Sequence, residues 1–170
     1  MAAPQHLIKL IEKHVGELLD IVIREHTGIR LLKCKLKNFN GDHIFVKDEI
    51  TKEKLKLPLL EDDYYELCYI YNEYVIDLIK AKEPRTLKDK LKNNPGNKEV
   101  IARLKPFLEQ ILTVIYRSQY GVGISKGRFI NMGINQLFLM PGPFYNTEES
   151  LPYSNILHLF DDSGKDLLVF

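Results

Sequence analysis

The chain has 170 residues, which suffices for one compact domain, or two small ones, whose core needs no metal or disulfide. Its composition, 45% apolar and 28% charged, is that of a soluble globular protein, and no run of about 18 apolar residues predicts a membrane-spanning helix. The N-terminus lacks the charged and then apolar pattern of a secretory signal, so we expect a cytoplasmic protein.

The residue types that usually hold metals show no paired spacing. Cys34 and Cys68 are far apart and stand among apolar residues, which predicts buried, reduced thiols. The five histidines have neither the H-x-x-x-H nor the H-x-H spacing of metal sites. The sequence therefore predicts no metal site and no cofactor.

The net charge of +1 hides an uneven distribution along the chain. Residues 1–60 carry +3 and residues 84–128 carry +7, whereas residues 61–83 carry −5 and residues 129–170 carry −4. Such blocks either neutralise one another in the fold or mark an anionic partner, and both interpretations stay open.

The first half of the chain predicts one helix and then short strands. Residues 4–16 have apolar side chains at helical spacing, and residues 17–27 fit either a continued helix or a strand. Between residues 29 and 58 apolar and basic residues alternate, in I-R-L-L-K-C-K-L-K, H-I-F-V-K and K-L-K-L-P-L, with N-F-N-G-D and D-E-I-T-K as turns. This alternation predicts an antiparallel β-meander.

A helix followed by short strands with such turns resembles the small five-stranded barrels of the Sm-like and SH3-like group. It is also similar to the barrel that precedes the cyclic-di-GMP-binding domain in flagellar-brake proteins. The resemblance covers about residues 5–60, and it implies a fold without implying a ligand.

The middle of the chain predicts helices. Apolar and aromatic residues recur every three or four positions over residues 61–82, a short basic segment follows over residues 86–92, and residues 98–118 repeat the helical pattern around Pro106. Tyrosines surround the first of these helices, so we expect some of them to form a protein interface: Tyr64, Tyr65, Tyr69, Tyr71 and Tyr74.

After residue 128 the pattern returns to strands, with R-F-I-N-M, I-N-Q-L-F-L-M, a P-G-P-F-Y-N loop and a hairpin around D-D-S-G-K. We recognise no internal repeat. The predicted fold class is α+β, with an N-terminal helix, a small antiparallel meander of the SH3- or Sm-like barrel kind, central helices and C-terminal antiparallel hairpins. Residues 1–170 are expected to form a single compact domain, with residues 1–60 and 61–170 as its sub-units.

Residues 120–129, Y-G-V-G-I-S-K-G-R-F, resemble several catalytic motifs without satisfying any of them. The G-x-S-x-G pattern needs a strand-to-helix turn and the order Ser-Asp-His, whereas His158 here precedes Asp161 and Asp162. A phosphate loop needs Gly-Lys-Ser or Gly-Lys-Thr, but here the lysine precedes the glycine. The acidic and lysine-rich D-E-I-T-K-E-K fits a nuclease only as a chance match. We therefore predict no catalytic residues.

The same stretch fits a looser phosphate site. Successive glycines can turn backbone N–H groups toward an anion, a serine adds a donor, cations grip phosphate and an aromatic ring can stack on a base. The competing interpretation is a glycine-rich turn with solvated cations. The predicted ligand-binding residues are Arg117, Tyr120, Gly121, Gly123, Ser125, Lys126, Gly127 and Arg128.

Because each catalytic pattern fails in order or spacing, we expect a non-catalytic binding or regulatory module whose ligand bears phosphate, either a nucleotide or a nucleic acid such as RNA. The alternative is a protein–protein adaptor that uses the tyrosine-rich segment and the P-G-P-F-Y loop. A small hydrolase or nuclease comes third.

Overall fold

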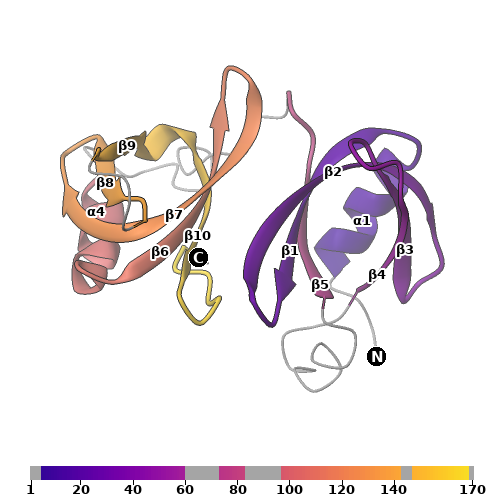
Figure 1. Cartoon of the computed structure of the whole chain (residues 1–170), viewed down its shortest axis with the longest axis horizontal. Helices are drawn as coiled ribbons and strands as arrows, with labels where there is room; N and C mark the ends of the chain where they lie inside the picture. Colours follow the sequence, from indigo (N-terminus) through magenta and orange to yellow (C-terminus); the bar gives the residue numbers. More distant parts are fainter. Residues whose placement is uncertain (1–4, 60–72, 83–96, 143–146, 169–170) are drawn as a thin grey trace. The chain divides into compact units, whose positions relative to one another are not determined.

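The computed structural model describes residues 5–59, 73–82, 97–142 and 147–168 (Figure 1). The chain divides into two compact units, Met1–Ala81 (unit 1) and Lys82–Phe170 (unit 2). In the part of the chain that is described, no helix is long and apolar enough to cross a membrane.

Unit 1 consists of one helix and a five-stranded antiparallel sheet in the order β4-β3-β2-β1-β5. Its elements are α1 (Gln5–His14), β1 (Leu18–Glu25), β2 (Gly28–Phe39), β3 (His43–Asp48), β4 (Lys54–Pro58) and β5 (Glu73–Ile79).

The core of unit 1 follows from two periodicities. Leu7 and Ile11 lie one helical turn apart on the buried face of α1. In β2, Cys34 and Leu36 point into the core, whereas Lys35 between them is exposed. Strand alternation thus separates an apolar inner face from a basic outer face.

Unit 2 contains the same kinds of element in the same order, and its sheet order is β10-β6-β7-β8-β9. Its elements are α4 (Lys98–Leu104), the 3-10 helix η3 (Lys105–Phe107), β6 (Ile111–Ser118), β7 (Gly121–Met132), β8 (Gln136–Met140), β9 (Glu149–Pro152), the 3-10 helix η4 (Tyr153–Asn155) and β10 (Ile156–Asp161). Leu112, Phe129 and Leu139 belong to a separate core cluster within this unit.

The two units align in sequence with a constant shift of 93 residues over the helix and the first three strands, so that Gly28 corresponds to Gly121. The turn glycine between the first two strands has positive φ in both units, 136° at Gly28 and 113° at Gly121. The register of the second strand shifts before Asn38 in unit 1 and before Asn131 in unit 2. The two units are therefore two copies of one layout, and the prediction that the chain has no repeat is wrong.

The predicted α+β fold class is also wrong, because the described residues form two five-stranded antiparallel sheets with few helical residues. The helix predicted over residues 61–82 is contradicted by strand β5 at Glu73–Ile79, and residues 60–72 lie outside the described part. The basic helix predicted over residues 86–92 also lies outside it.

The helix predicted over residues 98–118 contains two kinds of structure. Its first part is helical up to Phe107 and includes Pro106 in η3. Its second part is strand β6. Residues 17–27, which fit either structure, form strand β1. In β1 and β6 consecutive residues are buried, so the apolar run matches helical and strand spacing equally well.

Candidate functional site

The decapeptide 120–129 is the turn and the first part of β7 in the β6–β7 hairpin, and does not connect a helix to a strand. Ser118 pairs with Gly121 across the turn, and the positive φ of 113° at Gly121 explains a glycine there. Tyr120 is 88% exposed at the tip of the hairpin. An extended strand rises about 3.3 Å per residue, so Tyr120 lies roughly 20 Å from Lys126.

Gly123 and Gly127 serve close packing within the sheet. A Cβ atom on Gly123 would lie 2.8 Å from the ring of Tyr116, its partner on β6. A Cβ atom on Gly127 would lie 2.7 Å from the backbone oxygen of Met140. Both glycines stand inside the strand and neither has positive φ, so they do not build the curved nest of N–H groups that holds an anion.

Ser125 already has a partner. Its Oγ lies 2.7 and 2.8 Å from the two carboxylate oxygens of Glu149 on β9 and donates its proton to them. The downstream histidine, His158, pairs with Asp166 through Nδ1 at 3.1 Å. Ser125 therefore has a carboxylate where a hydrolase needs a histidine base.

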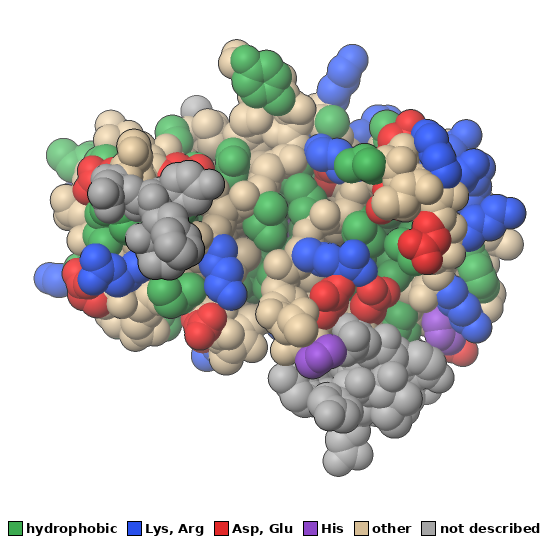
Figure 2. Space-filling view, viewed as in Figure 1, with side chains coloured by type: hydrophobic (Ala, Val, Ile, Leu, Met, Phe, Trp, Pro, Cys, Tyr) green, Lys and Arg blue, Asp and Glu red, His purple; other side chains and the backbone are tan. Residues whose placement is uncertain are grey.

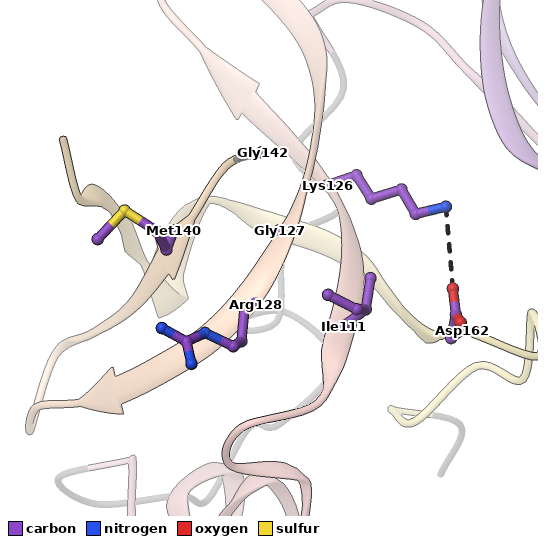
Figure 3. Close-up of a pocket in the computed structure, with 7 residues that line it drawn as sticks. All are labelled: Ile111, Lys126, Gly127, Arg128, Met140, Gly142 and Asp162. Carbon is purple, nitrogen blue, oxygen red and sulfur yellow. Dashed lines mark ion pairs between the residues drawn. The ribbon is translucent and has the colours of Figure 1, made fainter. Parts of the chain in front are cut away.

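Lys126 and Arg128 both line one open pocket of about 640 Å³ on unit 2 (Figure 3). The other residues that line this pocket are Ile111, Gly127, Met140, Gly142 and Asp162. Of these five, the sequence predicted only Gly127 as a site residue, because the other four lie outside the decapeptide. Figure 3 shows the Lys126 side chain extending toward Asp162, whereas the Arg128 side chain leaves β7 in another direction.

Each of these cations has an acidic neighbour. Lys126 Nζ lies 3.8 Å from an Asp162 carboxylate oxygen, and Arg128 donates to Glu109 over 3.2 Å. All four side chains are more than half exposed. Water therefore screens both ion pairs, and each stabilises the fold by about 0–1 kcal/mol.

Arg117 is not brought to this pocket. It lies on β6 opposite Val122, whereas Lys126 lies opposite Thr113. Four residues of strand separate the two positions, which is about 13 Å. The predicted ligand-binding residues are thus spread along a hairpin, and two of its cations, Lys126 and Arg128, line one pocket.

The acidic residues of the predicted nuclease site lie in and beside the turn between β3 and β4. Asp48 accepts the backbone N–H groups of Thr51 and Ile50, which hold the pKa of Asp48 below its usual range. Glu49 pairs with Lys52 over 3.4 Å, and the described residues contain no group of three or more potential metal ligands. The acidic side chains of this turn thus fold the hairpin without forming a metal site.

Of the tyrosines predicted at an interface, Tyr74 is 5% exposed in β5, with the Arg24 guanidinium 5.8 Å from its ring centre. The other four, Tyr64, Tyr65, Tyr69 and Tyr71, and most of the P-G-P-F-Y loop lie outside the described residues. No described contact favours the adaptor.

The chain matches no family model, no curated protein and no solved structure. The ligand is therefore inferred from the side chains of the chain itself.

Proposed function

We propose that the chain is a non-catalytic binding module whose ligand, a nucleotide or a nucleic acid, places a phosphate group in the pocket beside Lys126 and Arg128. The observation that carries the proposal is that these two cations, two residues apart on β7, line the same open pocket. An arginine fork and a lysine point charge are the side chains that proteins use most often for phosphate.

The present partners of these cations can be replaced at low cost. Asp162 is 71% exposed and Glu109 is 66% exposed, so a phosphate group competes with carboxylates that are bound weakly. Ile111 and Met140 add apolar surface to the same pocket, against which a base or sugar packs.

The test is the double variant Lys126→Ala with Arg128→Ala, titrated with inorganic phosphate and a panel of nucleotides. We expect binding to weaken by roughly 2–4 kcal/mol, about 1–2 for each charge-assisted contact. Unfolding should barely change, because exposed cations contribute little to stability. A matched control is Lys98→Ala with Lys105→Ala, which removes the same charge from exposed positions on α4 and η3.

Asp162→Asn gives an effect of opposite sign. Because it removes the carboxylate that competes for Lys126, it should tighten phosphate binding. A double variant that binds every tested anion as well as the parent would show that Lys126 and Arg128 are solvated surface cations.

A further inference from the structure

The outer face of β2, β3 and β4 in unit 1 carries a concentration of positive charge that none of the motifs above uses. Side chains that point away from the core on these strands are mostly lysine, because apolar and basic residues alternate. We call this surface the lysine face and define it as Lys35, Lys37, Lys47, Lys54 and Lys56.

Three of these lysines stand directly opposite one another across neighbouring strands. Lys35 on β2 pairs in register with Lys47 on β3, and Lys47 pairs with Lys54 on β4. Strands in a sheet lie about 4.8 Å apart, so the three side chains form a row of like charges. Like charges directly opposite one another destabilise a sheet.

Among the described residues, the lysine face has no acidic partner. In the ranges that the structure describes, none of its five lysines forms an ion pair with a carboxylate, whereas the neighbouring Lys33 pairs with Asp20 over 2.9 Å. Figure 2 shows lysine and arginine side chains gathered over the part of unit 1 that β3 and β4 form. The described carboxylates thus do not neutralise the positive charge of this face.

An aromatic ring lies within this face. Phe45 on β3 is half-buried, and its cross-strand neighbours are Asn38 on β2 and Lys56 on β4. Proteins that bind single-stranded nucleic acids combine aromatic rings with cations, because bases stack on the rings while phosphates contact the cations. The ring therefore favours a ligand with bases over a phosphate surface that has none.

Unit 2 provides an internal comparison. Most of its equivalent positions have lost the charge although the layout is the same: Lys37, Lys47 and Lys56 correspond to Ile130, Met140 and Ser150. Lys35 corresponds to Arg128, which keeps the charge, and Phe45 corresponds to Phe138. The row of lysines is thus no requirement of the layout, since the second copy folds without it.

From this charge, its repulsive arrangement and the ring within it, we propose that the lysine face binds a single-stranded nucleic acid through its phosphate backbone. This proposal does not rest on the pocket of unit 2, because it uses other residues on the other unit.

The test uses the full chain and a fluorescent single-stranded oligouridylate, with oligothymidylate as the second probe, from about 50 to about 200 mM salt. If each of the five lysines neutralises one phosphate, the slope of log K against log salt should be about −3.5, or about −0.7 for each contact. The variant Lys35→Gln, Lys47→Gln, Lys54→Gln should reduce the steepness of that slope by about 2 and weaken binding at about 50 mM salt at least tenfold.

Two variants separate charge at this face from charge in general. Replacing the same three lysines by arginine should preserve the slope, since the cations remain. Replacing the exposed Lys9, Lys98 and Lys105 by Gln removes equal charge from helical positions and should leave binding unchanged.

The proposal is overturned if the triple Gln variant binds both oligonucleotides as the helical control does. It is also overturned if the parent binds vesicles that contain anionic phospholipid, with the same three lysines required, and binds neither oligonucleotide. Loss of oligonucleotide binding in the triple Gln variant, with nucleotide binding at Lys126 and Arg128 retained, supports two independent sites. The Lys126→Ala, Arg128→Ala variant should in turn keep the part of the salt slope that the triple Gln variant removes.

Discussion

Gly123 and Gly127 lie in the same strand, but a side chain at each position would contact a different kind of atom. The atoms that a side chain on Gly123 would meet belong to the end of the Tyr116 ring, which can turn away. The atoms near Gly127 belong to the backbone of Met140 and Pro141, which cannot move without disturbing the sheet. Packing within the sheet thus explains both glycines, although the sequence placed them in a loose phosphate site.

We therefore expect Gly127→Ala to destabilise the fold by about 1–3 kcal/mol and Gly123→Ala by less than about 1 kcal/mol. Urea unfolding measures both. In Tyr116→Ala the cost of Gly123→Ala should disappear, because the ring that it meets is gone. Equal costs for the two glycines would contradict this account.

Cys34 is buried in the core of unit 1, and burial, together with the carboxylates of Asp48 and Asp20, raises its pKa to about 12. At pH 8 the reactive thiolate is therefore scarcely present in the folded chain. In a Cys68→Ser variant we expect the remaining thiol to react with a thiol reagent only after denaturation. Reaction of the native variant at the denatured rate would show that Cys34 is accessible.

At the scale of elements, the sequence predicted the strands that have one solvent-facing side. In β2 and β4 lysine alternates with apolar residues, and this alternation is specific to strands. The burial patterns of β1, β5, β6 and β10 instead contain runs of neighbouring buried residues. For β5 and β6 the sequence predicted a helix, and for β1 it left helix and strand open. For β6, Leu112 and Ile115 fit helical spacing as well as Leu112 and Val114 fit a strand.

The row of lysines on β2, β3 and β4 also predicts a stability effect. Lys47 lies between Lys35 and Lys54, so Lys47→Glu replaces two repulsive cross-strand pairs by two attractive ones. We expect the free energy of unfolding to rise by about 1 kcal/mol at low salt, since each pair contributes roughly 0.2–1 kcal/mol. The gain should shrink as salt screens the charges.

Lys9→Glu on α1 is the control, because it changes the charge equally at an exposed position outside the sheet. If Lys47→Glu lowers stability or matches the control, the lysines do not repel one another in the fold. A stabilising substitution that removes nucleic-acid binding would indicate that the row is retained for binding, since natural proteins trade stability for function at such positions.

At the scale of the whole molecule, net charge counted along the chain does not show which cations the fold gathers on one surface. Residues 84–128 have the highest net charge, but Lys126 and Arg128 each face a carboxylate. Residues 1–60 have a smaller excess, yet alternation places their lysines together on one side of a sheet. The repeat was missed for a related reason, because few equivalent positions keep the same residue and many core positions exchange one apolar residue for another, as Val22 for Ile115 and Leu36 for Phe129.

Each unit has its own sheet and its own core cluster, and the lysine face lies entirely on unit 1. A chain of about 80 residues can fold on such a core. We therefore expect Met1–Ala81, produced alone, to show a β-rich far-ultraviolet spectrum and cooperative unfolding. It should bind oligouridylate with the salt slope of the full chain, because all the lysines that set the slope are present. Lys82–Phe170 should show a much shallower slope. A folded Met1–Ala81 that has lost the slope, with the slope retained by Lys82–Phe170, would assign the nucleic-acid contact to unit 2 and overturn the assignment to the lysine face.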